Sequence, residues 1–272
     1  ADAGVLDDFI EPAESILTKA FSKLVAVDSR RWIKFLTDIL PRFSCELAAS
    51  LSDFEKRMLQ MFYITVFQEA ADWRSHTTQA NMQLLADSPI MMHELYALLA
   101  LNLERIDFID QPVPLGFDCP LDLHCTYTRD QILIAMDYMT PKNVREGVKW
   151  LPDKQVDVFF ITLNKADKDY SPTTMYNDYS INESLFHWQS QSTTSDTAST
   201  GQRYINHRQR GSKVVLFVRE FKQDSIGAAP YTCLGTAVYV KHTGSKPMNI
   251  TWHLDQPIPA KYLRKTNKLV VG

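Results

Sequence analysis

Apolar residues recur at three- and four-residue steps through the first hundred or so positions, which is the period of a helix with one buried face. Ser52 followed by Glu55 is a capping box that opens one of these helices, and Pro41 must end or kink another. The expected helices cover residues 8–26, residues 31–49 and the segments that begin at Ser52 and at Ser88-Pro89. Residues 1–110 are therefore predicted to form a bundle of four or five helices.

The pattern changes after residues 111–120, where three prolines and a glycine mark a connector. A short helix is expected over 129–137, and then runs of β-branched and aromatic residues separated by glycines predict strands. The expected strands are Val156–Leu163, Phe186–Ser190, Lys213–Phe221, Thr232–Val240 and Met248–Leu254. The fold class is thus α+β, in which residues 111–272 form a small mixed, mainly antiparallel β-barrel or strongly bent sheet.

Two long connections, residues 164–182 and 191–212, lie between these strands. Loops of that length are often functional. The segment Gln189–Gly201 is low in complexity and is predicted to be a mobile loop.

In the stretch Phe-His-Trp-Gln-Ser-Gln-Ser at 186–192, side chains of different chemistry alternate along the chain. As a strand, it puts Phe186 and Trp188 on one face and His187, Gln189 and Gln191 on the other. An imidazole and two carboxamides donate and accept hydrogen bonds without fixed charge at neutral pH. Alone, this polar set is typical of a solvated strand face.

Charge is distributed unevenly around the net value of −3. Residues 1–110 carry 10 basic against 17 acidic side chains, a net −7, whereas residues 201–272 carry 12 against three, a net +9. A basic block of this kind is expected of a domain that binds a polyanion. The acidic bundle would repel phosphate and is expected to dock against another protein domain.

Apolar runs fall short of the roughly 18–20 uncharged residues that span a bilayer, so no membrane association is expected. The four cysteines lack the spacing of a disulfide framework, which suits a reducing cytoplasm. A fragment of a longer protein or a processed product is expected, because no initiator methionine begins the chain.

The sequence motifs that could indicate an enzyme or a metal site are incomplete. Glu220 and Lys222 end an apolar strand as an acidic-x-Lys pair, which could hold a divalent metal if Asp153 or Asp157 lay beside them. Cys119, His124 and Cys125 lack the second ligand pair of a structural zinc site. Phosphate-binding loops and dinucleotide fingerprints are absent from the sequence. No catalytic residue, metal or cofactor is therefore expected.

Aromatic, amide and basic residues are concentrated between 164 and 208. Aromatic rings stack on bases, amides match base edges, and Lys and Arg hold phosphates. We expect the side chains of His187, Gln189, Gln191 and Asn206 to hydrogen-bond to base edges. We expect the ring of Tyr176, Tyr179 or Trp188 to stack on a base. The full set of candidate nucleic-acid contacts is Lys165, Lys168, Tyr176, Tyr179, His187, Trp188, Gln189, Gln191, Arg203, Asn206, His207 and Arg208.

Several blocks in order resemble a bacterial C-terminal domain family of unknown function. They are FFITLNKADKDYSPTTMYNDYSINESLFHWQSQSTTS, GQRYINH, LFVRE, YTCLGTAVYV and PMNITWHLDQPIPA. The resemblance covers nearly the whole chain and is strongest over 105–262. Members of that family follow a phospholipase-D-type nuclease and a superfamily 2 helicase, as in SauUSI-like restriction enzymes that cut DNA carrying modified cytosine.

The resemblance implies a target-recognition module for DNA, which would work with helicase and nuclease domains of the same protein in phage defence. It also implies an SRA- or PUA-like barrel that flips a modified cytosine into a pocket. Two other functions are compatible with the sequence: a non-catalytic module that couples helicase to nuclease, and the metal-dependent nuclease built on Glu220 and Lys222.

Overall fold

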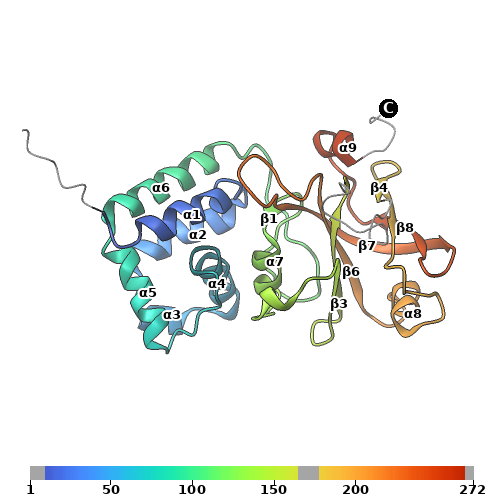
Figure 1. Cartoon of the computed structure of the whole chain (residues 1–272), viewed down its shortest axis with the longest axis horizontal. Coiled ribbons are helices and arrows are strands. Elements are labelled where there is room, and N and C mark those ends of the chain that lie inside the picture. The colour runs from blue at the N-terminus through green and yellow to red at the C-terminus, as the bar shows by residue number, and fades with distance from the viewer. Residues whose placement is uncertain (1–9, 165–177, 267–272) are drawn as a thin grey trace, which may run out of the picture. The chain divides into compact units, whose positions relative to one another are not determined.

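The computed structural model describes residues 10–164 and 178–266 of the chain (Figure 1). The chain divides into two compact units, Ala1–Phe108 and Ile109–Gly272. The predicted boundary, between residues 110 and 111, lies two residues from this division.

The first unit is helical, as predicted. Its helices are α1 (Glu14–Leu24), α2 (Arg30–Ile39), the 3-10 turn η1 (Leu40–Arg42), α3 (Cys45–Ser50), α4 (Asp53–Phe67), α5 (His76–Ala86) and α6 (Pro89–Glu104). Pro41 divides the apolar pattern of 31–49 into α2 and α3, because proline cannot continue the helical hydrogen bonds. The pattern did not predict α5, in which only Thr78, Met82 and Leu85 are buried.

The start of α4 carries the predicted capping box. The Ser52 hydroxyl accepts a hydrogen bond from the Glu55 N–H at 3.3 Å, and the Glu55 carboxylate accepts one from the Ser52 N–H at 2.9 Å. Hydrogen bonding to Ser52 lowers the pKa of Glu55 below its usual value. Both bonds satisfy N–H groups that the helix itself cannot reach.

Replacing Ser52 by alanine is therefore expected to lower the free energy of unfolding of the first unit by about 1 kcal/mol. Ser22→Ala is the matched control, since the hydroxyl of the exposed Ser22 only donates to the Lys19 carbonyl within α1. Urea denaturation of both variants measures the difference. Equal stabilities would contradict the capping role.

No single helix in the described part of the chain is long and apolar enough to cross a lipid bilayer. Helices α5 and α6 reach the required length and composition only when they are counted together, and they are bent by 83° at the break between them.

The second unit is built on one eight-stranded sheet. Its strands are β1 (Thr126–Tyr127), β2 (Val148–Leu151), β3 (Val156–Thr162), β4 (Tyr179–Ser180), β5 (Leu185–Gln189), β6 (Lys213–Arg219), β7 (Tyr231–Thr243) and β8 (Asn249–Leu254). They run in the order β2-β3-β6-β7-β8-β5-β4, and β1 pairs with β7. All pairings are antiparallel except that of β3 with β6.

This sheet is mixed and mainly antiparallel, as predicted, but the predicted closed barrel is wrong. A barrel would need its two terminal strands to pair, whereas β2 and β4 end the sheet on opposite sides. The five predicted strands correspond to β3, β5, β6, β7 and β8, with bounds that differ by up to three residues.

Both faces of the sheet centre are buried, because neighbouring residues of a strand point to opposite sides. Phe159 packs on one face against Trp188, Tyr204 and Trp252, with ring centroids 4.4–5.5 Å apart. Phe160, next in the strand, contacts the rings of β6 and β7 on the other face. Strand β3 is buried along its whole length, which explains its continuous apolar run.

Three α-helices accompany the sheet: α7 (Arg129–Ala135), α8 (Ser199–Ile205) and α9 (Ala260–Thr266). Figure 1 shows α7 and α8 on opposite sides of β3 and β6. Helix α8 begins inside the low-complexity stretch predicted to be a mobile loop. Gly201 lets α8 approach the preceding turn, since a Cβ there would lie 2.0 Å from the Ser195 carbonyl oxygen.

Candidate nucleic-acid interface

The side of β5 that carries His187 and Gln189 extends across three neighbouring strands. Residues paired in antiparallel strands point to the same side of a sheet. His187 pairs with Tyr179 of β4 and Thr251 of β8, and Thr251 pairs with Lys241 of β7. We call this surface the polar sheet face; its members are Tyr179, His187, Gln189, Lys241, Thr243, Asn249 and Thr251. None of them is a carboxylate.

Two contacts organise the polar sheet face. The rings of Tyr179 and His187 are stacked, with centroids 4.7 Å apart and planes inclined by 15°. The Gln189 amide donates to the Asn249 side-chain carbonyl at 3.1 Å. The predicted alternation is confirmed, because Phe186 and Trp188 are buried while His187 and Gln189 are partly exposed on the other side.

Basic side chains lie beside the part of β7 that contributes to this face. The turn after α8 carries exposed Arg208 and Arg210, and it is fixed to β7 by a hydrogen bond from the Tyr239 N–H to His207 Nε2 at 3.1 Å. Lys241 is itself exposed. Positive charge therefore borders β7, but the turn itself packs on the other side of the sheet, where the His207 ring lies 5.8 Å from that of Trp252 in the core.

Trp188 and Arg203, two of the predicted contacts, belong to the interior. Trp188 is 5% exposed and packs against Phe159, so it supports the core rather than stacking on a base. Arg203 donates twice to the fully buried Asp157 carboxylate, at 2.7 and 2.9 Å, and lies over the Trp150 ring. Burial raises the pKa of Asp157, and the Arg203 guanidinium opposes that rise.

Two of the three further predicted contacts, Asn206 and His207, have local structural partners. The Asn206 amide donates to the Gln202 backbone carbonyl at 3.1 Å at the end of α8. His207 is buried; its Nδ1 lies 3.2 Å from the Ser212 carbonyl while its Nε2 accepts the bond from Tyr239, which describes a neutral imidazole. Burial lowers the pKa of His207 in agreement with this form. Gln191 is half-buried just after β5.

The remaining predictions divide as follows. Lys165, Lys168 and Tyr176 lie outside the described residues. Tyr179, His187 and Gln189 are brought together, and Arg208 is exposed in the turn after α8. Sequence reasoning missed Lys241, Thr243, Asn249 and Thr251. The alternation of NITWHL could have placed Asn249 and Thr251 opposite the core, but it could not have paired β8 with β5.

The acidic residues required for a metal-dependent nuclease are far apart. Strands β3 and β6 are parallel, with Asp157 beside Val214, so Glu220 lies six residues further along. At about 3.3 Å per residue that separation is roughly 20 Å. Asp157 is also paired with Arg203. Within the described residues, no three His, Cys, Asp or Glu side chains are grouped to hold a metal ion.

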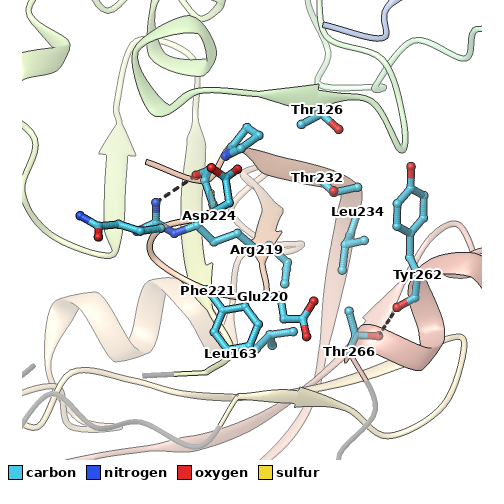
Figure 2. A pocket seen from close by; sticks show the side chains of 14 residues that line it. Thr126, Leu163, Arg219, Glu220, Phe221, Asp224, Thr232, Leu234, Tyr262 and Thr266 are labelled. Atoms are coloured by element: carbon cyan, nitrogen blue, oxygen red, sulfur yellow. Dashed lines mark hydrogen bonds between the residues drawn. The ribbon is translucent and has the colours of Figure 1, made fainter. Parts of the chain in front are cut away.

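A cavity of about 290 Å³ lies where β6 ends and β7 begins (Figure 2). Leu163, Val218 and Leu234 provide apolar lining, and Phe221 and Tyr262 contribute aromatic rings. The Glu220 carboxylate projects among them. None of these residues was predicted to form a pocket. Lys241 lies nine residues along β7 from Thr232 of the cavity, roughly 30 Å by strand rise, so the cavity and the polar sheet face are separate.

A family model described as Domain of unknown function (DUF3427) matches residues 121–265, just over half of the chain. The chain belongs to this family. The match confirms the predicted resemblance to a domain family of unknown function, and the DUF3427 region contains both the polar sheet face and nearly all of the cavity lining. A comparison with curated proteins gives no match.

Proposed function

We propose that the Ile109–Gly272 unit is a DNA-recognition domain without catalysis of its own. The polar sheet face supports the proposal: neutral donors and acceptors suited to base edges lie beside Lys241, and no carboxylate is among them. Exposed Arg208 and Arg210, in the turn that is bonded to β7, add positive charge, and residues 201–272 carry a net +9.

In this proposal Lys241, Arg208 and Arg210 contact phosphates, whereas His187 and Gln189 read the bases. The domain serves as the target-recognition part of a helicase–nuclease restriction protein and prefers modified cytosine. A methyl or hydroxymethyl group adds a small contact, worth about 1–3 kcal/mol, so a preference of about tenfold over unmodified DNA is expected.

Fluorescence anisotropy with duplexes containing cytosine, 5-methylcytosine or 5-hydroxymethylcytosine tests the proposal. Lys241→Ala is expected to weaken binding to all three duplexes and to reduce the slope of log K against log salt by about one. Gln189→Ala is expected to reduce discrimination among them more than total affinity. Lys34→Ala and Gln79→Ala, exposed positions of the first unit, are matched controls that should bind like the parent chain.

The outcomes separate the alternatives. Absence of binding to all duplexes at low salt would reject DNA recognition. Equal binding to all three, with a steep salt dependence, would leave only a nonspecific clamp. Normal DNA binding by Gln189→Ala and Lys241→Ala would remove the polar sheet face from the interface.

A coupling module is the second candidate, favoured by apolar side chains on the first unit. Helix α6 exposes Ile90 and Leu101, and the adjoining residues of the second unit include exposed Ile109. Exposed apolar positions of this kind suit contact with another protein domain. Binding of the chain to the helicase domain, lost in Ile90→Asp with Leu101→Asp, would support coupling; retention of that binding would argue against this surface.

A further inference from the structure

The cavity at the end of β6 has the size and shape of a small-ligand site. Its volume of about 290 Å³ lies at the lower end of the range for small-molecule pockets, about 300–1,000 Å³. It therefore suits a single ring system. Strand residues Val218 and Leu234 and the end of β3 at Leu163 give it apolar walls, which favour a planar ligand with apolar faces.

Two aromatic side chains line this space from different elements. Phe221 follows β6 and is 52% exposed, which leaves much of its ring accessible beside the cavity. Tyr262 comes from α9 and is positioned by its hydroxyl, which donates to the His124 carbonyl at 3.2 Å. Rings of this kind stack on flat heterocycles.

Two carboxylates line the cavity, and that of Asp224 already accepts hydrogen bonds from the Ile226 and Gly227 N–H groups, which leaves Glu220. Its half-buried carboxylate projects toward Leu234 and Thr266 (Figure 2), and it has no hydrogen-bond or ion-pair partner among the described residues. The neighbouring Arg219 also lines the cavity, but it donates to Thr162 Oγ1 at 2.9 Å and to the Ala229 carbonyl at 3.1 Å rather than to Glu220. Within the described part of the chain, the Glu220 carboxylate is thus available to a ligand.

An ionised carboxylate only accepts hydrogen bonds, so the ligand must present N–H donors. Cytosine, adenine and guanine carry an exocyclic amino group, and acidic side chains accept from the cytosine amino group in known protein–DNA contacts. Thymine and uracil lack this group. Exposed Lys261 and Arg264 belong to α9, the helix that carries Tyr262, and their positive charge suits a phosphate attached to the base.

We propose that this cavity binds an amino-bearing nucleobase, with Glu220 accepting from the amino group and Phe221 and Tyr262 contacting the ring faces. The base belongs either to a free nucleotide or to a nucleic-acid strand; only the second source rests on the proposed DNA-recognition function. This site is distinct from the polar sheet face.

The full chain is titrated with the 5′-monophosphates of deoxycytidine and thymidine, and with oligonucleotides of deoxycytidine and of thymidine, by calorimetry. One charge-assisted hydrogen bond distinguishes the cytosine ligand from the thymine ligand. Whether the monophosphates or the oligonucleotides bind, we therefore expect the cytosine ligand to bind about tenfold more tightly than its thymine counterpart. Glu220→Gln is expected to abolish this preference, and Phe221→Ala to weaken binding about fivefold or more. Glu183→Gln, an exposed carboxylate in the β4–β5 turn, is the matched control and should bind like the parent chain.

Equal affinity for the cytosine and thymine probes, or a cytosine preference that survives Glu220→Gln in a folded chain, would overturn the inference. Binding of the monophosphate alone would support the cavity with a free nucleotide as its source. DNA binding that depends on Lys241 and Gln189 but ignores Glu220 would uphold the proposed function and reject the cavity as a base site. Circular dichroism melting establishes that each variant is folded.

Discussion

Replacing Arg203 by alanine is expected to destabilise the second unit by about 3–5 kcal/mol, because the change leaves the Asp157 carboxylate buried and unpaired. Asp157 is fully buried, and the Arg203 side chain is 17% exposed, so solvent screens the pair weakly. Hydrogen exchange of β3 and β6 under urea measures the loss for this unit separately from the helical unit.

The destabilisation should depend on pH in a defined direction. Burial already raises the pKa of Asp157, and removal of Arg203 takes away the group that opposes this rise. A carboxyl whose pKa is higher when folded than when unfolded favours folding in its protonated form. The deficit of Arg203→Ala should therefore shrink as the pH falls and the Asp157 carboxyl becomes neutral.

Two variants complete this test. Arg208→Ala removes an exposed arginine from the turn after α8 and should change stability by less than about 0.5 kcal/mol. Combining Asp157→Leu with Arg203→Met removes both charges and should recover much of the loss. A stable Arg203→Ala chain that has lost DNA affinity would instead assign Arg203 to phosphate binding, as the sequence predicted.

Replacing Phe159 by alanine is expected to cost about 3–5 kcal/mol through the cavity that it leaves. The Phe159 ring is fully buried among Trp188, Tyr204 and Trp252, which come from three different elements and cannot all move into the space. Tryptophan fluorescence during urea unfolding should report the loss, since two of these neighbours are indoles.

Phe221→Ala is the matched control for Phe159→Ala, because it removes the same atoms from a ring that is 52% exposed. We expect it to change the free energy of unfolding by less than about 1 kcal/mol. Comparable losses in the free energy of unfolding for the two variants would contradict the placement of Phe159 in the core.

The long strands were predictable because each is a run of several residues rich in β-branched side chains, which is the sequence signal of a strand. The two-residue strands β1 and β4 were not, since a run of two residues has no period. Helices α8 and α9, seven residues each, are too short to form alone and depend on packing by Tyr204 and Tyr262. Alternation also could not distinguish an open sheet from a barrel, because inward and outward residues alternate in both.

The candidate interface was predictable only within one strand. The alternation of Phe186, His187, Trp188 and Gln189 assigned their sides correctly. It could not show that Asn249 and Lys241 continue the same face, because these residues come from strands that pair only in the folded sheet. Arg203 looked like a phosphate contact because its partner, Asp157, is 46 residues away in the chain.

The sequence by itself determined the helical first part, the β-rich second part, the uneven charge and the two sides of β5, because each is a local property of residue order or composition. Only the tertiary structure decided that the sheet is open, that Trp188 and Arg203 are internal, and that a cavity surrounds Glu220. These features depend on which distant segments meet, and burial or pairing at such contacts outweighs the tendency of any single residue.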